Sequence, residues 1–447
     1  MTKKQINIEK EVNPHFKDVW KGKKAFNILK GGRNSFKSSV IALLLVSLLI
    51  PYLIRGKKAN IVVIRKVGNT IRDSVFNKIQ WALKKFFLLT KFDTTVSPFK
   101  ITHKKTGSTF YFYGQDDFQK LKSNDIDDII AVWYEEAAEF KDAEEFDQTN
   151  ITFMRQQHAD AKFVRFYWSY NPPRNPYAWI NEWADEKRSD PAYLVHESSY
   201  LNDKLGFVTK QMLDMINRIK ENDYDYYRYL YLGEPVGLGT NVYNMNLFNV
   251  INELPDNDRL IALYFAIDTG HQVSATSCCA FATTARGNVI LVDTYYYSPA
   301  GRVDKKAPSE LSKELHDFME SVREKYNLRV MEKTIDSAEG GIRNQYYLDY
   351  SERLHPVAKK SKVIMIDYVH DLLAQGRFFI LSQTNNQKKP NNYSGANDIF
   401  LEEHKKYRWD EKTVKGANVE VVKEDDHTCD TFQYFVLDNL RELGLDY

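Results

Sequence analysis

The sequence predicts an α/β protein of two domains, the first with a mostly parallel sheet and the second with a mixed sheet. A small-residue loop with one lysine, at 31–39, separates a short apolar segment from a long apolar run. Apolar runs typical of buried strands end in carboxylates in both halves. Glycines and a proline at 233–239 interrupt the pattern, and 447 residues exceed the size at which a single core stops growing. We therefore predict a first domain at 1–240, a linker at 241–258 and a second domain at 259–447.

The loop predicts a phosphate-binding P-loop, because a strand, small residues, Lys-Ser and a helix follow in that order. Backbone N–H groups and the positive end of the helix would surround the β- and γ-phosphates of ATP. Lys37 would add a charge there, and Ser38 would ligate Mg²⁺. Phe36 stands where the motif usually has its second glycine, so its Cβ restricts the backbone. A polar loop with an incidental lysine is the alternative.

Two further strands are predicted in the same sheet. The run 129–136 ends in Glu135, expected on the metal side beside the loop strand, and Glu136, expected as the general base for water. A strand at 163–169 stops before prolines, and Ser169 or Asn171 at its tip would sense the γ-phosphate. A proline-directed turn explains that tip equally well.

The second half suggests a mixed sheet of ribonuclease H type. A strand at 263–270 carries Asp268, and a second, antiparallel strand follows at 288–296. After a helix comes the strand that carries Asp336, and Asp430 precedes a helix at 431–441.

Three acids on separate elements make chemical sense if they converge on two divalent cations, Mg²⁺ or Mn²⁺, about 4 Å apart. Such a pair clamps the attacking water and the leaving oxygen of a phosphodiester. Asp268 would bridge both ions, with Asp336 and Asp430 each favouring one. Exposed acids at strand ends are the alternative.

In this order, the motifs resemble those of the large terminase subunit of tailed bacteriophages. The segments that carry the resemblance are 31–39, 65–74, 113–117 with 120–123, 133–137, 169–172, 232–235 and the three acids. The resemblance implies an ATP-driven motor that moves double-stranded DNA into a procapsid and a two-metal endonuclease that cuts concatemeric DNA. It also implies a small terminase subunit, a portal protein and a homo-oligomer as partners.

The resemblance also supports the residue assignments. It implies a coupling role for the turn at 169–172 and auxiliary positions at His427 and Asp426, and Arg33 or Arg72 would stabilise charge on the γ-phosphate. The candidate catalytic residues are Lys37, Glu136, Asp268, Asp336 and Asp430. The candidate residues for ATP and its Mg²⁺ are Gly31, Gly32, Arg33, Asn34, Ser35, Lys37, Ser38, Ser39 and Glu135. A helicase or recombination ATPase with a nuclease domain, and an ATP-binding scaffold without turnover, are the alternatives.

Composition bounds the location and the partners. The 62 basic and 60 acidic residues nearly cancel, so net charge does not indicate a nucleic-acid binder. Basic clusters such as 359–362 fit a solvated face, although any could touch phosphates. The apolar run 40–54 is short for a membrane span and predicts a buried helix. Without a secretory signal or metal-type cysteine spacing, we expect a protein of the infected bacterial cytoplasm, neither secreted nor membrane-bound.

Overall fold

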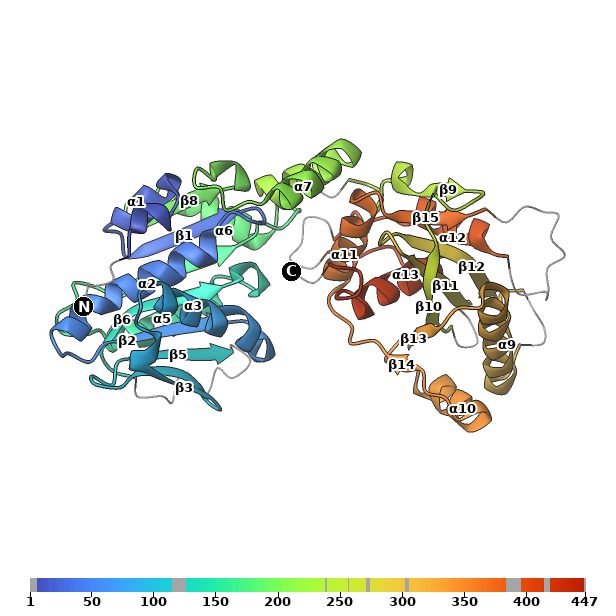
Figure 1. The fold of residues 1–447 in the computed structure, drawn as a ribbon, viewed down its shortest axis with the longest axis horizontal. Helices are drawn as coiled ribbons and strands as arrows, with labels where there is room; N and C mark the ends of the chain where they lie inside the picture. The colour runs from blue at the N-terminus through green and yellow to red at the C-terminus, as the bar shows by residue number, and fades with distance from the viewer. Residues whose placement is uncertain are drawn as a thin grey trace. The chain divides into compact units, whose positions relative to one another are not determined.

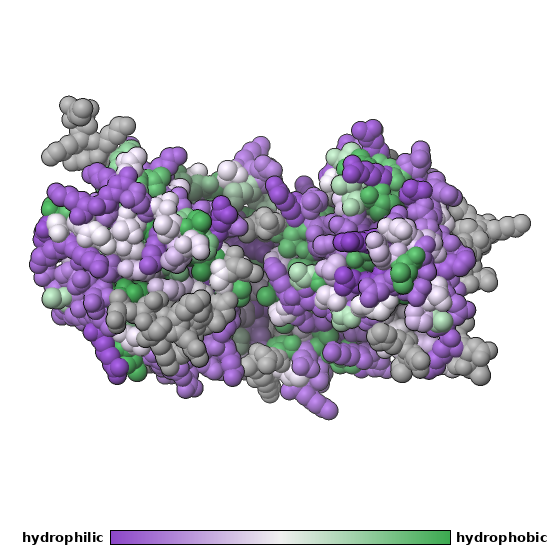
Figure 2. All heavy atoms as spheres, turned by 90° about the horizontal axis from the view of Figure 1, so that it is seen from below, coloured by the Kyte–Doolittle hydropathy of each residue, from purple (hydrophilic) through white to green (hydrophobic). Residues whose placement is uncertain are grey.

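The computed structural model describes residues 6–114, 126–237, 239–255, 257–270, 274–301, 305–382, 395–413 and 419–445 (Figure 1). The chain divides into two compact units, and each is described by itself. Unit 1 comprises Met1–Asn217 and Tyr224–Gly237, and unit 2 comprises Arg218–Asp223 and Leu238–Tyr447. Most of the motif at 113–123 lies outside the described residues. On the face drawn in Figure 2, hydrophilic residues cover most of the surface and hydrophobic residues form separate patches.

Unit 1 is built on an eight-stranded sheet, counted over the described residues, with the order β3-β4-β5-β2-β6-β7-β1-β8. All pairs from β5 to β8 are parallel, and the β3–β4 hairpin adds antiparallel pairs at one edge. The sheet is mostly parallel, as predicted. Its elements are α1 Lys17–Lys21, β1 Phe26–Gly31, α2 Lys37–Ile54, β2 Asn60–Arg65, α3 Asn77–Lys85, β3 Phe92–Val96, β4 Phe99–His103, β5 Thr109–Gly114, β6 Ile129–Glu135, α5 Glu144–Arg155, β7 Arg165–Tyr170, α6 Trp179–Lys187, β8 Tyr193–Ser198, α7 Lys210–Asn222 and α8 Tyr224–Tyr227.

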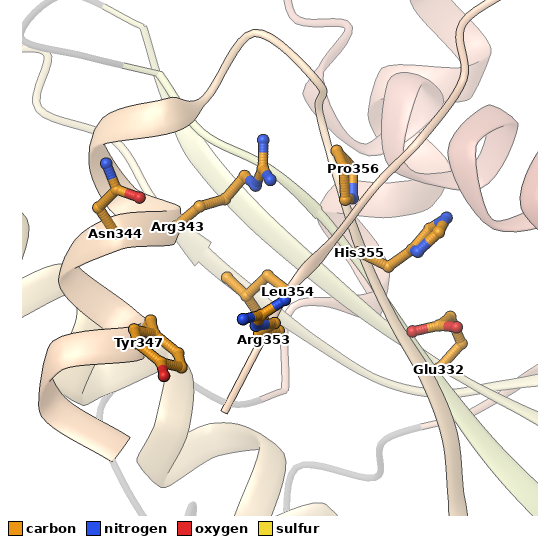
Figure 3. A pocket seen from close by; sticks show the side chains of 8 residues that line it. All are labelled: Glu332, Arg343, Asn344, Tyr347, Arg353, Leu354, His355 and Pro356. Atoms are coloured by element: carbon orange, nitrogen blue, oxygen red, sulfur yellow. The ribbon is translucent and has the colours of Figure 1, made fainter. Parts of the chain in front are cut away.

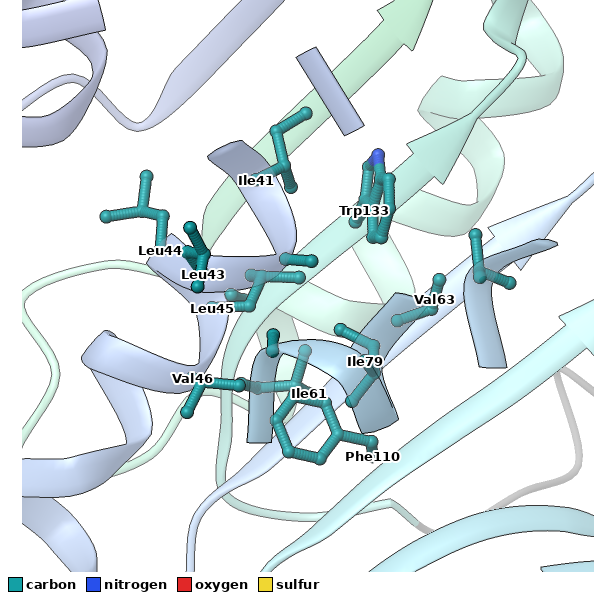
Figure 4. Close-up of a cluster of buried hydrophobic side chains, with 14 of the residues drawn as sticks. Ile41, Leu43, Leu44, Leu45, Val46, Ile61, Val63, Ile79, Phe110 and Trp133 are labelled. Atoms are coloured by element: carbon teal, nitrogen blue, oxygen red, sulfur yellow. The ribbon is translucent and has the colours of Figure 1, made fainter. Parts of the chain in front are cut away.

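Helices cover both faces of this sheet, which is why its central strands are apolar throughout. In β2, Ile61 and Val63 pack in the core formed with α2 and α3, whereas Val62 and Ile64 pack in the core formed with α5 and α6. Figure 4 shows side chains of α2 directed at this sheet, with Trp133 of β6 among them. Alternate side chains therefore belong to two cores, and the strand ends are held rigidly between helical layers.

Helix α2 begins directly after the loop at 31–36. Of the helices in the described residues, it is the one long and apolar enough to cross a membrane by length and composition alone. Residues 40–46 are all buried, and eight of its buried apolar side chains pack in the α2–α3 core. The helix is therefore placed as the core helix of unit 1, as its position after the loop predicts.

The order of the strands corrects one expectation. Strand β6, which ends in Glu135, is not beside β1, because β7 lies between them and pairs with both. The third predicted strand, β7, therefore lies between the other two, β6 and β1. In register, Ser169 of β7 lies between Leu29 of β1 and Glu135 of β6.

Unit 2 contains a mixed sheet with the order β14-β13-β10-β11-β12-β15-β9, again over the described residues. Strands β10, β11 and β12 are antiparallel neighbours, and the other pairs are parallel. Helices α11 to α13 pack on one face, and α9 and α10 on the other. The elements are β9 Asn249–Ile251, β10 Leu260–Asp268, β11 Thr276–Thr284, β12 Val289–Tyr297, α9 Pro308–Tyr326, β13 Val330–Ile335, α10 Gly340–Tyr350, β14 His355–Pro356, α11 Lys362–Ala374, β15 Phe378–Leu381, α12 Asn397–Lys406 and α13 His427–Asp438.

Three details of unit 2 differ from the predictions. Strand β11 lies between β10 and β12, so the two strands expected to pair do not touch. The stretch predicted as a linker contributes β9, which pairs with β15. Helix α13 begins at His427, so Asp430 lies within its first turn rather than before it. The first difference arises because tertiary strand pairing, rather than local pattern, decides the order of strands in a sheet.

Candidate functional site

The glycines of the loop after β1 are required by close backbone packing. A Cβ at Gly31 would lie 2.0 Å from the carbonyl oxygen of Ser198, and one at Gly32 would lie 2.2 Å from that of Tyr231. Gly233 has φ +72°, and its Cβ would lie 2.6 Å from the nitrogen of Gly32. Only glycine fits these positions, so the loop is locked between the end of β8 and residues 230–233.

Phe36 adopts the left-handed backbone that the motif normally assigns to glycine. Its φ is 69°, and it caps α2. Its ring contacts that of Phe207, with centroids 5.8 Å apart, and packs at the edge of the α2–α3 core. The left-handed conformation costs about 1–2 kcal/mol for a residue with a Cβ, and packing of the phenyl group offsets part of that cost.

Lys37 is buried and its ammonium is surrounded by oxygens. Nζ donates to the carbonyl oxygens of Gly31 at 2.8 Å and Gly32 at 3.1 Å, to Ser35 Oγ at 2.8 Å and to Asn171 Oδ1 at 2.9 Å. Burial lowers the pKa of Lys37 to about 8, and the negative charges of Glu136 and Glu135 oppose that shift. A cation held over the loop carbonyls at this point can move to the phosphates of a nucleotide.

The two glutamates at the end of β6 occupy different environments. Glu135 is 8% exposed and forms an ion pair with Arg65, with Oε2 3.3 Å from Nε, at an angle outside that of a hydrogen bond. Burial, followed by the charge of Glu136, raises the pKa of Glu135 to about 7 against the field of Arg65. Glu136 is half-buried in a left-handed conformation, φ 53°, just past the strand. A half-buried carboxylate next to a buried one suits the base and metal-side roles predicted for them.

The tip of β7 connects the loop to β6. Trp133 of β6 donates to Ser169 Oγ at 2.9 Å, and Asn171 accepts from Lys37. Residues predicted on three strands therefore meet at the carboxyl edge of one parallel sheet, where ligands of such sheets bind.

Other predicted residues of unit 1 are less directly involved. Ser38 and Arg33 are half-buried, and the Arg33 backbone N–H donates to Leu230 O at 2.7 Å. Ser39 Oγ accepts from Lys78 at 3.4 Å. Arg72 is exposed in a short π-helix.

Sequence reasoning assigned no role to two residues that complete this site. Arg65 ends β2 and pairs with Glu135, and Gly233 contacts the loop. A charged residue at the end of a fully buried strand was the available signal for Arg65. No local signal could pair Gly233 with a loop two hundred residues away.

The first acid of unit 2, Asp268, is the last residue of β10 and is held by His427. Asp268 Oδ2 lies 2.9 Å from His427 Nδ1, and the backbone N–H of Ala275 donates to Nε2 at 3.3 Å. Because Nε2 accepts, Nδ1 carries the hydrogen that Asp268 receives. Burial raises the pKa of Asp268 to about 6, the hydrogen bond from His427 opposes that rise, and the charges of Asp430 and Asp336 add to it.

The other two acids each form an ion pair with a lysine from the segment after β14. Asp336 directly follows β13 and contacts Lys359 and the Tyr434 hydroxyl, at 3.1 Å. Burial alone would raise its pKa, but Lys359 and backbone N–H groups hold the pKa of Asp336 below its usual value. Asp430 pairs with Lys362. These lysines belong to the basic cluster 359–362; Lys359 is exposed and Lys362 is half-buried, and each pairs with an aspartate.

The donor chemistry of the three acids fits hard divalent cations. The charges of Asp430 and Asp336 contribute to the raised pKa of Asp268, so the three acids interact electrostatically. Thr269 Oγ1 and Ser277 Oγ, beside Asp268 in chain or register, are buried without hydrogen-bond partners. Within the part of the chain that the structure describes, however, no three His, Cys, Asp or Glu side chains are grouped as a ready metal site. The lysines must move before a cation can bind all three acids.

Two acids near α13 have other environments. Asp426 is the residue before the helix, and burial followed by the charge of Asp430 raises its pKa. Glu403, which sequence reasoning missed, is 3% exposed and accepts from the N–H and Oγ1 of Thr428, both at 2.6 Å. Glu403 thereby fixes the first turn of α13, which carries His427 and Asp430.

The fold and the two sites define a class of proteins in which a P-loop-type α/β unit is followed by an RNase H-like unit. The family model of the phage terminase large subunit matches residues 23–234, and that of the terminase RNase H-like domain matches residues 268–438. The chain belongs to the family of phage terminase large subunits.

Individual relatives agree with this placement. The chain is 31% identical over 242 residues to the terminase large subunit of Bacillus phage SPP1, covering 53% of this chain and 56% of that protein. It is 28% identical over 237 residues to the PBSX phage terminase large subunit of Bacillus subtilis strain 168, covering 49% and 52%. The chain thus spans about half the length of the curated relatives it matches. The large terminase of a thermophilic bacteriophage has the same fold, with a TM-score of 0.75 at 17% identity, covering 96% of this chain and 99% of that one.

Proposed function

We propose that this protein is an ATP-driven DNA-packaging motor subunit with a metal-dependent endonuclease. The observation that carries the proposal is the meeting of Lys37, Asn171 and the Glu135–Glu136 pair at one sheet edge, in a chain whose second unit gathers three aspartates. The terminase family membership supports reading the two sites together.

In unit 1, the loop residues would bind the phosphates of ATP. Lys37 exchanges its carbonyl partners for the β- and γ-phosphate oxygens, and Ser38 with Glu135 would hold Mg²⁺. Glu136 accepts the proton of the attacking water, while Arg65 opposes the rise that burial causes in the pKa of Glu135. Loss of the γ-phosphate returns Lys37 to Asn171, which passes the change to β7. Structures of the large terminase of the same thermophilic bacteriophage with ATPγS and with ADP support nucleotide binding by this fold.

In unit 2, Asp268, Asp336 and Asp430 would hold divalent cations, as two Mg²⁺ or Mn²⁺ ions. Such cations would supply Lewis-acid stabilisation of charge on a phosphodiester. The chain's own part is to orient the acids: His427 fixes Asp268, Glu403 fixes the start of α13, and Lys359 and Lys362 neutralise the acids until the substrate arrives.

The partners follow from the proposed role. Double-stranded DNA would be moved by unit 1 and cut by unit 2. A small terminase subunit, a portal protein on the procapsid and further copies of this chain would complete the motor. The work would take place in the cytoplasm of the infected bacterium.

The test is ATP hydrolysis and Mn²⁺-dependent plasmid cleavage by the full-length protein. Lys37→Ala should abolish hydrolysis, while Lys66→Ala, a half-buried lysine paired with Glu145, should retain it. Asp268→Ala and Asp336→Ala should each abolish cleavage, while Asp317→Ala, an exposed acid on α9, should retain it. Hydrolysis by Lys37→Ala at the normal rate would support the binding scaffold instead. Failure of a portal protein to stimulate hydrolysis would favour a helicase-type ATPase.

A further inference from the structure

A cavity of about 540 Å³ lies in unit 2 between helix α10 and strand β14, outside the three-aspartate cluster. Its lining includes Arg343, Asn344 and Tyr347 from α10, and Arg353 and His355 from the following segment. Figure 3 shows Arg343 extending from α10 towards the segment that carries His355 and Pro356, and Arg353 beside Leu354. A cavity of this size can hold a nucleotide-sized group.

The cavity presents two guanidinium groups that the protein itself does not neutralise. Within the described residues, neither Arg343 nor Arg353 forms an ion pair with a carboxylate, and Arg343 Nε is buried without a hydrogen-bond partner. The Arg353 guanidinium lies 5.5 Å from the centroid of the Tyr347 ring. Buried N–H donors without acceptors are unfavourable unless a ligand accepts from them.

The acidic groups near the cavity do not cancel this charge. Glu332 lines the cavity, and its Oε1 accepts from the backbone N–H of Lys333 at 3.1 Å. His355 Nε2 lies 3.2 Å from Asp438 Oδ1, so Asp438 faces the histidine rather than the arginines. Within the cavity lining two arginines face one glutamate, Glu332, and Arg353 also lines a neighbouring groove with Glu320 and Glu352.

The cavity is tied to the acid cluster through paired strands. His355 and Pro356 pair with Thr334 and Ile335, and Asp336 is the next residue of the chain. Pro356, which lines the cavity, therefore pairs with the residue that directly precedes Asp336. A polyanion that reaches Asp336 thus has a second anion-binding position at the same end of the sheet.

We propose that Arg343 and Arg353 bind a phosphate group of the DNA backbone, at a position next to the phosphodiester that the acids address. Guanidinium groups bind phosphate through two parallel N–H···O bonds, which fixes orientation as well as position. This site would set the register of the duplex on unit 2. The inference rests on the proposed function, since it requires DNA at the acid cluster.

The experiment measures binding of a fluorescent DNA duplex by anisotropy, with full-length protein in EDTA so that no cleavage occurs. A double variant of the cavity, Arg343→Gln and Arg353→Gln, is compared with a control double variant, Arg286→Gln and Arg441→Gln. The control changes two exposed arginines of the same unit. For the variant that lacks both cavity arginines, we expect about tenfold weaker binding. The slope of the logarithm of the binding constant against the logarithm of salt concentration should fall by about the value of one phosphate contact. The control double variant should change neither quantity. Thermal melting confirms that each variant is folded.

Two further arms separate the sources of the phosphate and the nature of the contact. Inorganic phosphate and a mononucleotide are added as competitors, and at millimolar concentration neither should displace the duplex if the backbone is the ligand. Arg343→Lys with Arg353→Lys should recover the salt dependence but only part of the affinity, because lysine keeps charge and lacks the planar fork.

The inference would be overturned if the cavity double variant and the control double variant lost equal affinity for the duplex. Unchanged duplex binding by a folded cavity double variant would also overturn it. Displacement by the mononucleotide alone would assign the cavity to free nucleotide and overturn the DNA assignment. If wild-type protein binds no duplex, the proposed function itself fails, and that outcome is distinct from a pocket variant that binds like wild type.

Discussion

At the scale of single residues, Phe36 replaces the usual glycine of the motif, yet the loop keeps the backbone conformation that glycine would adopt there. The left-handed φ of 69° is kept, and packing of the ring against Phe207 offsets its cost. The sequence predicted a restriction at this position. Only the structure shows that the strained conformation is adopted rather than avoided.

This gives a testable order of stability. Phe36→Ala should lower the free energy of unfolding by about 1–2 kcal/mol through lost packing, and Phe36→Gly should be about 1 kcal/mol more stable than Phe36→Ala. Urea denaturation measures both. The control is Ser47, in the middle of α2, where the order should reverse because glycine destabilises a helix interior. Alanine at least as stable as glycine at position 36 would contradict the strain.

The lysines on the acid cluster give a second prediction at this scale. Lys362→Gln should lower stability in EDTA by about 1–2 kcal/mol, because a partly buried Asp430 loses its partner while solvent screens part of the effect. The same change should lower the Mn²⁺ concentration needed for half-maximal plasmid cleavage. Lys360→Gln, whose lysine contacts only the exposed side of Tyr368, is the matched control. A Mn²⁺ requirement that is equal in the two variants would show that Lys362 does not compete with the metal.

At the scale of elements, helix α12 carries a buried histidine that the motifs did not indicate. His404 is fully buried against Phe400, with ring centroids 4.1 Å apart, and its Nδ1 bonds to Phe400 O at 2.7 Å. Burial lowers the pKa of His404 to about 3. Next to it on the same helix, Glu403 fixes the start of α13, so this packing supports the acid cluster.

The low pKa makes acid stability depend on this residue. The unfolded state takes up a proton near pH 6.5 and the folded state does not until about pH 3, so stability is full above pH 6.5 and falls as pH falls towards 3. The loss amounts to about 2 kcal/mol at pH 5. His404→Phe should remove that part of the pH dependence, measured by urea denaturation between pH 8 and pH 5. Phe400→Leu, which loses packing but keeps the histidine, should retain the wild-type slope, and an unchanged slope in His404→Phe would contradict the assignment.

At the scale of the whole molecule, the two units have separate cores and separate candidate sites. Lys37→Ala should therefore abolish ATP hydrolysis while leaving Mn²⁺-dependent plasmid cleavage in the absence of ATP within about twofold, and Asp268→Ala should do the reverse. Parallel assays on the same preparations of full-length protein measure this. Loss of both activities in either folded variant would show that the sites depend on each other.

Much of this architecture could be predicted from local patterns. The order of strand, loop, Lys-Ser and helix defines the P-loop region, because phosphate binding needs that order along the chain. Apolar runs ending in acids predicted β6 and β10, because buried strands must be apolar and polar groups can lie only at their ends. Strand β13 does not follow this pattern, since it carries Glu332, Lys333 and Thr334. The two sheet types followed from the same patterns. The limits of the predicted domains and the roles of the site residues stay proposals.

Other features depended on contacts between residues far apart in the chain. The position of β7 between β1 and β6, the ion pair of Arg65 with Glu135, and the fit of Gly233 against the loop all join distant segments. Lys359 and Lys362 look like surface charges in the sequence, yet they neutralise Asp336 and Asp430. The sequence by itself determined which elements form and which end of each carries polar groups, because those depend on neighbours along the chain. Only the tertiary structure decided strand order and charge pairing, because these depend on which segments the packed cores bring together.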